Sequence, residues 1–241
     1  MNVVCGVHSV RLALERGQVR RLMLDARRKD RRLQELRSLA KRHGARVEEA
    51  PPAELDRLAE GVRHQGAVAE IEGAPPLTEN QFEAWLAQAD EPFVLVLDGV
   101  EDPRNLGACL RAADGAGVDA VVMPRRRAAG LTPAARKTAS GAAEALTVFA
   151  VTNLARALDA MGDAGLKRVG AVLGEASTSP WEIDLTGPVA LVLGAEATGV
   201  RRLTRERLDA TVSLPMLGSV ESLNVAVACG VLVYEARRQR G

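Results

Sequence analysis

The sequence predicts an α/β protein with a small N-terminal unit and a larger unit built on a parallel sheet. From Phe93 onward, short apolar runs typical of buried strands alternate with helical patterns. Between Arg11 and Arg46 there are 13 Lys or Arg residues against 4 Asp or Glu, a local net charge of +9. From residue 91 to the end the two counts are 17 and 17, and no Lys or Arg occurs between Gly73 and Asp90. This change in composition separates two units.

The composition is that of an ordinary globular protein. Of 241 residues, 47% are apolar and 26% charged, and because aromatics make up only 2%, the core must be built from Leu, Val and Ala. No apolar run is long enough to span a membrane, and the N-terminus shows no basic-then-apolar leader. The three cysteines lie far apart and have no metal-ligand spacing, so we expect reduced thiols, no metal site and a cytoplasmic protein.

The N-terminal unit is predicted to alternate helices with short strands. Its clearest helix places Leu33, Leu36, Leu39 and Ala40 on one face and stops at His43-Gly44. The other expected elements are a helix at Val7–Leu14, a strand at Val19–Leu24, a strand at Arg46–Glu48, a helix at Ala53–Glu60 and a strand at Ala67–Ile71. The dense positive charge favours a polyanion-binding module, with a solvated, Arg-rich helix face as the alternative.

A Gly/Pro-rich stretch at Gly73–Pro76 predicts a hinge. We therefore expect a first domain at residues 1–72, a linker at 73–90 and a second domain at 91–241. A helix around Gln81–Gln88 is expected to belong to the linker or to the second domain. In the second domain the expected strands are Phe93–Leu97, Ala120–Met123, Val169–Leu173, Val189–Leu193 and Thr211–Leu214, followed by a last helix at Leu223–Arg238. Ligands of such parallel sheets bind beyond the carboxyl ends of the strands.

The loop after the first of these strands, Asp98–Gly107, runs into a helix that carries Arg111. Asn105 and Arg111 are six residues apart, so they do not share a helical stripe if both are helical. They could converge if Asn105 lies at the helix start, where Asn is a good cap. The plainer alternative is a capping residue and a surface arginine.

A second loop, Leu193–Gly199, follows an apolar strand directly. Its glycines, Gly194 and Gly199, allow the backbone to approach a ligand closely. It is not the dinucleotide-binding fingerprint, because Glu196 stands where that pattern needs its middle glycine. An NAD-dependent oxidoreductase is therefore disfavoured, although a glycine-flanked loop is common in α/β proteins.

A third loop, Leu214–Val225, joins a strand to the last helix. We expect Ser222 to cap that helix and Asn224 to lie in its first turn. Leu214, Met216, Leu217 and Leu223 could form an apolar slot for a flat ring. The alternative is an ordinary capped helix with its core contacts.

Taken in order, the three loops carry the patterns D-G-V-x-D-P-x-N-L-G…R, V-L-G-x-E-x-x-G and L-P-M-x-G-x-V-x-S-L-N-V. From about Phe93 to the C-terminus, the chain thus resembles the SpoU branch of the SPOUT methyltransferases, departing from the pattern only at Glu221. The N-terminal part, from Gly6-Val7-His8 to His64-Gln65-Gly66, is similar to the RNA-binding domain, resembling ribosomal protein L30e, that precedes the catalytic domain in this family.

The resemblance implies a SPOUT catalytic and dimerisation domain with a deep trefoil knot, preceded by an RNA-substrate-binding domain. It implies S-adenosylmethionine as the cofactor and a homodimer whose active sites draw on both subunits. The implied cofactor-binding residues are Leu193, Gly194, Gly199, Leu214, Met216, Ser222 and Leu223. The implied catalytic residues are Asn105, Arg111, Glu196, Ser222 and Asn224.

The implied activity is methylation of a ribose 2′-hydroxyl of RNA, with a guanosine of 23S ribosomal RNA as the leading substrate. Arg111 would lie at the 2′-oxygen, oriented with the ribose and cofactor by the other four catalytic residues. A transfer-RNA 2′-O-methyltransferase and a non-catalytic RNA-binding protein of the same fold are the alternatives.

Overall fold

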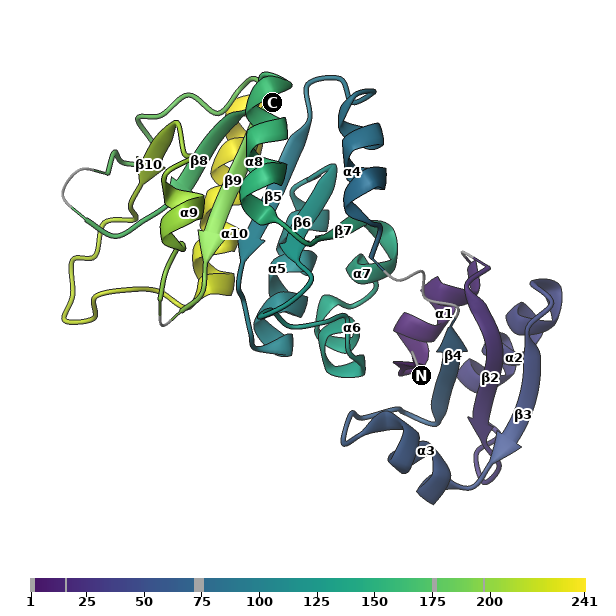
Figure 1. Cartoon of the computed structure of the whole chain (residues 1–241). Helices are drawn as coiled ribbons and strands as arrows, with labels where there is room; N and C mark the ends of the chain where they lie inside the picture. Colours follow the sequence, from purple (N-terminus) through teal and green to yellow (C-terminus); the bar gives the residue numbers. More distant parts are fainter. Residues whose placement is uncertain (1–2, 16, 72–75, 175–176, 197) are drawn as a thin grey trace. The chain divides into compact units, whose positions relative to one another are not determined.

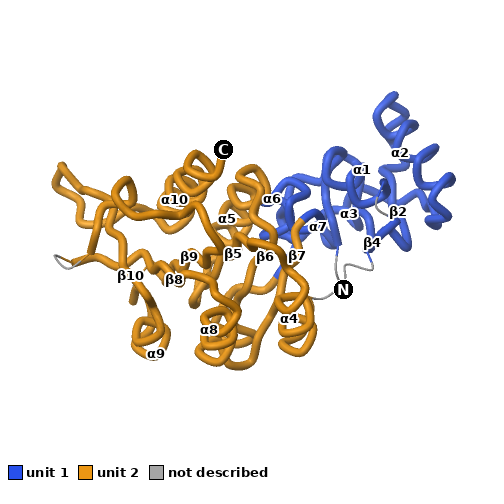
Figure 2. The backbone as a smooth tube through the Cα atoms, turned by 90° about the horizontal axis from the view of Figure 1, so that it is seen from above, with its two compact units in different colours: residues 1–75, 131–145 blue, residues 76–130, 146–241 orange. Residues whose placement is uncertain are grey.

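The structure is a computed structural model that describes residues 3–15, 17–71, 76–174, 177–196 and 198–241. The chain divides into two compact units, shown in different colours in Figure 2. The first comprises residues 1–75 and 131–145, and the second comprises residues 76–130 and 146–241. Each unit combines a sheet with helices (Figure 1), so the predicted α/β class is confirmed.

The first unit is built on a four-stranded mixed sheet with the order β1-β4-β2-β3. β4 is antiparallel to both β1 and β2, whereas β2 and β3 are parallel. Its strands are β1 (Val3–Cys5), β2 (Val19–Asp25), β3 (Arg46–Ala50) and β4 (Ala67–Ile71). Its helices are α1 (Val7–Glu15), α2 (Arg31–Arg42), α3 (Pro52–Ala59), α6 (Pro133–Ala139) and α7 (Ala142–Ala145).

Side chains alternate between the two faces of this sheet, as the period of a strand requires. In β2, Leu22 and Leu24 join the core formed with α1 and α2, whereas Met23 joins the core formed with α3. Helix α2 buries the four predicted residues and ends at His43 as expected. It begins at Asp30, whose carboxylate accepts the Leu33 N–H.

The second unit is built on a six-stranded sheet with the order β10-β8-β9-β5-β6-β7, in which every pairing is parallel. The predicted parallel sheet is therefore confirmed. Its strands are β5 (Phe93–Asp98), β6 (Ala120–Pro124), β7 (Thr147–Val151), β8 (Lys167–Ala171), β9 (Val189–Gly194) and β10 (Ala210–Val212). Its helices are α4 (Glu79–Leu86), α5 (Pro103–Gly115), α8 (Leu154–Asp163), α9 (Arg202–Arg205) and α10 (Val225–Arg240).

Helices cover both faces of this sheet. Helices α5 and α10 lie on one face, and α4, α8 and α9 lie on the other (Figure 2). The strands therefore have no solvent-facing side, which is why they read as continuous apolar runs rather than alternating ones. The strands β5 and β9, whose following loops carry two of the motifs, are neighbours at the centre of the sheet.

The contacts divide the chain differently from the predicted domains. Residues 131–145 belong to the first unit, where α6 packs on β1 and a buried ion pair joins Arg136 to Glu144 at 2.6 Å. Helix α4 lies in the second unit, against β7 and α8, which is one of the two places expected for this helix. Of the predicted hinge Gly73–Pro76, residues 73–75 lie outside the described part of the chain. The division by function at 72 and 91 stays a prediction.

Two strands were not predicted, β1 and β7. Both are short, at 3 and 5 residues, and β7 follows an alanine-rich helical stretch that masks where it begins. Among the described residues, no helix is both long enough and apolar enough to cross a membrane.

Candidate functional site

The three motif loops all leave the carboxyl ends of parallel strands in the second unit. The first follows β5 and leads into α5, whose N-cap is Asp102 rather than Asn105. The Asp102 carboxylate accepts the N–H groups of Arg104 at 2.6 Å and Asn105 at 3.4 Å. Asn105 therefore lies in the first turn of the helix, and its side chain is free to bond elsewhere.

Asn105 links the first loop to both of the others. Its side-chain amide N–H donates to a carboxylate oxygen of Glu196, which comes from the loop after β9. Its carbonyl oxygen accepts the side-chain amide N–H of Asn224 at 3.1 Å. An asparagine donates at one end and accepts at the other, so the bonds to Glu196 and Asn224 fix how its amide is turned. The structure thus brings together three of the five predicted catalytic residues.

Asn224 has a second role as the N-cap of α10, where its side-chain oxygen accepts the Ala226 N–H at 2.9 Å. The expectation that Ser222 caps this helix is therefore wrong. The helix begins two residues later, because Asn224 provides the capping oxygen at the position where the chain turns helical. Ser222 is exposed and lies instead at the wall of the cavity described below.

Arg111 is not in this cluster. It lies on α5 with Asn105, and six residues turn the helix through about 600°, which leaves the two side chains about 120° apart. The Arg111 side chain is exposed and forms no hydrogen bond or ion pair within the described residues. It shares the exposed stripe of α5 with Ala108 and Gly115.

The packing of α5 against α10 holds Asn105 and Asn224 side by side. The two helices make the most extensive helix–helix contact in the described part of the chain, with Cys109 and Cys229 buried between them. A hydrogen bond with Cys109, together with burial, raises the pKa of the Cys229 thiol well above its usual value. The Cys229 thiol is thus a neutral packing group and not a nucleophile.

Next to the polar cluster, a cavity of about 390 Å³ opens between the second and third loops. Its walls include all seven residues predicted to bind the cofactor, namely Leu193, Gly194, Gly199, Leu214, Met216, Ser222 and Leu223. Glu196 also lines this cavity, so the polar cluster and the apolar walls belong to one site. Val172 and Leu173, which follow β8, complete the apolar wall. The expectation that Leu217 belongs to the apolar slot is wrong, because this residue is 98% exposed and does not line the cavity.

Gly194 is required by close backbone packing. A Cβ at this position would lie 2.0 Å from the carbonyl carbon of Gly199 and 2.2 Å from the nitrogen of Val200. The loop closes on itself there, because Ala195 and Gly199 exchange backbone hydrogen bonds of 3.2 and 2.8 Å. The position of this loop, and with it that of Glu196, therefore depends on the absence of a side chain at Gly194.

An ion pair between buried Asp98 and half-buried Arg201 joins the loop after β9 to the end of β5. Asp98, at the end of β5, is fully buried, and its carboxylate accepts the Arg201 N–H at 2.9 Å. Nη1 of Arg201 lies 3.3 Å from the other carboxylate oxygen, and Nη2 donates to the Arg127 carbonyl at 2.9 Å. Arg201 thus ties the loops after β5, β6 and β9 together.

Sequence reasoning missed Arg201, Val172 and Leu173. Arg201 lies in a run of charged residues that reads as a solvated surface, and its partner is 103 positions away in the sequence. Val172 and Leu173 were read as strand rather than loop. Their position at the carboxyl end of a parallel strand was the available signal.

The comparisons with known proteins agree with this geometry. Residues 92–234 match the SpoU rRNA Methylase family, and residues 3–77 match the family described as RNA 2′-O ribose methyltransferase substrate binding. The chain is 47% identical over 241 residues to the 23S rRNA (guanosine-2′-O-)-methyltransferase RlmB of Pectobacterium atrosepticum, covering 99% of this chain and 98% of the relative. It is 48% identical over 241 residues to the RlmB of Yersinia pestis, with the same coverage of both chains.

A solved structure shows the same arrangement over nearly the whole chain. The SpoU methyltransferase AviRb from Streptomyces viridochromogenes, in complex with AdoMet, matches with a TM-score of 0.83 and 27% identity. The match covers 99% of this chain and 90% of that one. The chain belongs to the SpoU rRNA methylase family.

Proposed function

We infer that this protein transfers a methyl group from S-adenosylmethionine to the 2′-hydroxyl of a guanosine in 23S ribosomal RNA. The observation that carries this inference is the cavity whose walls meet the Glu196–Asn105–Asn224 chain. The relatives that are 47 and 48% identical over nearly the full chain are named for this reaction. The three buried, unpaired cysteines support a cytoplasmic location.

The residues of the cavity fit S-adenosylmethionine. Leu214, Met216 and Leu223 offer apolar walls for a flat adenine ring, and Gly194 allows the loop after β9 to close on itself at the cavity wall. The Glu196 carboxylate lies at the same cavity, and a negative charge there suits a positively charged cofactor. When bound, the cofactor supplies the electrophilic methyl group, so the protein must position the ribose and manage a proton.

In this proposal the polar chain holds the acceptor. Asn105 keeps Glu196 and Asn224 in fixed positions, and Ser222 lies at the cavity wall where a substrate oxygen would approach. Arg111 stabilises the negative charge that develops on the 2′-oxygen and holds the neighbouring phosphate. A guanidinium stays charged near neutral pH, so the hydroxyl proton leaves to solvent rather than to Arg111.

We propose that a second copy of the chain brings Arg111 to the site. Leu223, just before α10, and Val227 and Tyr234 on α10 form an exposed apolar stripe, at intervals of four and seven residues. The Tyr234 hydroxyl lies over Gly115 of α5, four residues from Arg111 on the same exposed face. A homodimer through this stripe would cover Arg111 as well, and would explain why a residue of the family motif lies outside the cluster of its own chain.

Replacing Val227 with aspartate should disrupt this dimer, because it places a charge in the centre of the apolar stripe. Multi-angle light scattering should report a monomer where the unchanged protein is a dimer, and methyl transfer should fall at least about tenfold. Leu203→Asp is the matched control, since Leu203 on α9 is 51% exposed and Val227 is 53% exposed. If both variants remain dimeric, the interface lies elsewhere.

The trefoil knot and the ribosomal-protein-L30e-like first domain are also proposals. The chain leaves β10 at one edge of the sheet, returns along residues 213–224 and packs α10 on α5 and β9. Residues from the end of β9 and the loop after it line one cavity with residues from the loop after β10, which supports the trefoil knot implied by the family. The mixed sheet with helices on both faces supports a ribosomal-protein-L30e-like first domain that binds the RNA substrate.

The activity can be tested directly with labelled cofactor and RNA from a strain that lacks the corresponding gene. We expect tritium from the methyl group of S-adenosylmethionine in the large ribosomal RNA, recovered as 2′-O-methylguanosine after nuclease digestion. Label in transfer RNA would mean that the protein carries out the proposed reaction but acts on transfer RNA. The absence of label from every RNA fraction would favour a binding protein without activity.

A further inference from the structure

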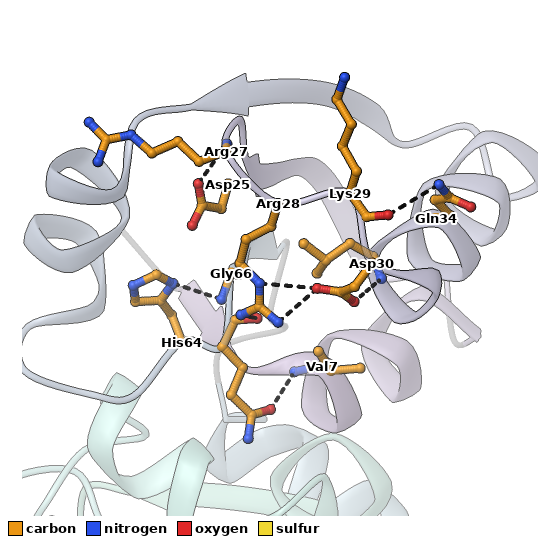
Figure 3. A network of polar contacts seen from close by, with 11 residues as sticks. Val7, Asp25, Arg27, Arg28, Lys29, Asp30, Gln34, His64 and Gly66 are labelled. Carbon is orange, nitrogen blue, oxygen red and sulfur yellow. Dashed lines mark hydrogen bonds and ion pairs between the residues drawn. The ribbon is translucent and has the colours of Figure 1, made fainter.

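A second cavity, of about 510 Å³, lies in the first unit, away from the proposed catalytic residues. It is bordered by the end of β2, the start of α2 and the loop at residues 61–66 (Figure 3). Three arginines line it, Arg28, Arg32 and Arg63, together with the carboxylates of Asp25 and Asp56. Cations and carboxylates therefore face the same space.

One wall of this cavity is rigid without any ligand. Nε and Nη2 of Arg28 donate to Asp30 at 3.0 and 2.7 Å, and Nη1 donates to the carbonyl of Gln65 at 2.8 Å (Figure 3). The Gly66 N–H donates to Nδ1 of His64 at 3.1 Å, which leaves Nε2 to donate to Asp56 at 3.0 Å. A preformed wall of this kind reduces the ordering cost of binding.

The other two arginines have no such partners. Within the described residues, the side chains of Arg32 and Arg63 form neither a hydrogen bond nor an ion pair, and both residues are exposed. Two guanidiniums beside one cavity repel each other until an anion lies between them. Phosphate is the anion that the planar donor set of arginine matches well.

The carboxylate of Asp25 sets a second requirement on the ligand. Asp25 is only 8% exposed, and its Oδ1 accepts the Arg27 N–H at 2.9 Å. Its other oxygen has no hydrogen-bond donor among the described residues, although it belongs to a residue of the cavity wall. The free oxygen of Asp25 can therefore accept a hydrogen bond from an N–H donor of a ligand in the cavity. Inorganic phosphate or a simple polyanion would satisfy the arginines but not Asp25.

We propose that this cavity binds one unpaired nucleotide of the RNA substrate, with its phosphate on Arg32 and Arg63 and its base edge on Asp25. This inference rests on the proposed function and locates part of its RNA contact in the first unit. Sequence-specific RNA recognition commonly uses unstacked bases of single-stranded segments. Adenine, cytosine and guanine carry exocyclic N–H donors, whereas the one edge N–H of uracil lies between two carbonyls, so the cavity disfavours uracil.

The phosphate contacts are tested with the double variant Arg32→Gln/Arg63→Gln in the full chain. Its matched control is Arg20→Gln/Arg42→Gln. These two exposed arginines belong to the same unit, form no side-chain hydrogen bond or ion pair within the described residues and do not line the cavity. Affinity for a fragment of 23S ribosomal RNA is measured between about 50 and 200 mM salt. We expect at least about tenfold weaker binding for the cavity variant and a slope of log affinity against log salt that is smaller by about 0.7, the contribution of one phosphate of a single strand.

The base contact is tested with Asp25→Asn, which keeps an oxygen for the Arg27 N–H but turns the other acceptor into a donor. The unchanged protein should bind oligocytidylate at least about fivefold more tightly than oligouridylate, and the variant should lose this preference. Equal losses in the cavity variant and the arginine control, or no base preference in the unchanged protein, would overturn the inference.

Cofactor affinity and methyl transfer are measured in parallel, so that failure of the nucleotide-site proposal can be distinguished from failure of the proposed function. Unchanged RNA binding by Arg32→Gln/Arg63→Gln in a protein that methylates RNA would remove this nucleotide site and leave the proposed function in place. A protein that loses RNA affinity in this variant but transfers no methyl group would keep the nucleotide site and overturn the proposed function.

Discussion

Replacing Gly194 with alanine is expected to weaken S-adenosylmethionine binding by at least about 100-fold. The new Cβ would lie 2.0 to 2.2 Å from backbone atoms of Gly199 and Val200, which no side-chain rotation can relieve. The loop after β9 would have to move, and the hydrogen bond from the Arg201 N–H to buried Asp98 holds it in place. Isothermal titration calorimetry with the cofactor measures the loss, and circular dichroism checks that the variant is folded.

Gly218→Ala is the matched control for this experiment. Gly218 lies in the loop on the other side of the same cavity, and a Cβ there would meet no atom within 4 Å. We expect its cofactor affinity to stay within about twofold of that of the unchanged protein. If Gly194→Ala does not fold, Met216→Glu tests the cavity instead, since this half-buried wall residue can accept a charge without unfolding. Unchanged cofactor affinity in Met216→Glu or in a folded Gly194→Ala would show that the cofactor binds elsewhere.

The family resemblance predicted the residues around the cavity, whereas neither the resemblance nor the residue pattern predicted the cluster in full. All seven residues implied to bind the cofactor line the cavity, and their segments meet there because parallel strands end at the same edge of a sheet. Local pattern also predicted α2, because its four buried residues repeat with the helical period. The cavity residues and the buried face of α2 could both be predicted because the signal for each lies in a short stretch of chain.

The features that sequence reasoning did not provide depend on contacts distant in sequence. Asp98 and Arg201 are 103 residues apart, and nothing in either segment marks them as a pair. Residues 131–145 pack with the first unit although they lie between two strands of the second. The choice of Asn224 over Ser222 as the cap of α10 depends on where the backbone turns, and both residue types are good caps.

Arg111 shows the limit of a motif most clearly. The family pattern places it with Asn105, and the helix that carries both residues directs them to different sides. A catalytic role for Arg111 therefore requires a second chain, so this proposal depends on the proposed homodimer. If Val227→Asp gives a monomer that still methylates RNA at the original rate, Arg111 does not act across the dimer interface.

Replacing Asn105 with aspartate is expected to reduce methyl transfer by about 100-fold near pH 8 while leaving cofactor affinity within about threefold. The substitution keeps the shape of the side chain but replaces its N–H donor with an oxygen, so two carboxylates would face each other where Asn105 now donates to Glu196. Like charges raise the pKa of one member of such a pair. Glu101→Gln, an exposed neighbour on the same loop with no hydrogen bond among the described residues, should retain full activity.

The pH dependence of this variant separates positioning from a merely structural effect. As the pH falls, the carboxyl with the raised pKa takes up a proton and can again donate a hydrogen bond to its neighbour, as the amide does in the unchanged protein. The rate of Asn105→Asp relative to the unchanged protein should therefore rise as the pH is lowered from 8 to 6. A relative rate that is low and constant across this range would mean that the Asn105–Glu196 bond does not control the reaction. A loss that appears in cofactor affinity rather than in kcat would assign Asn105 to cofactor binding.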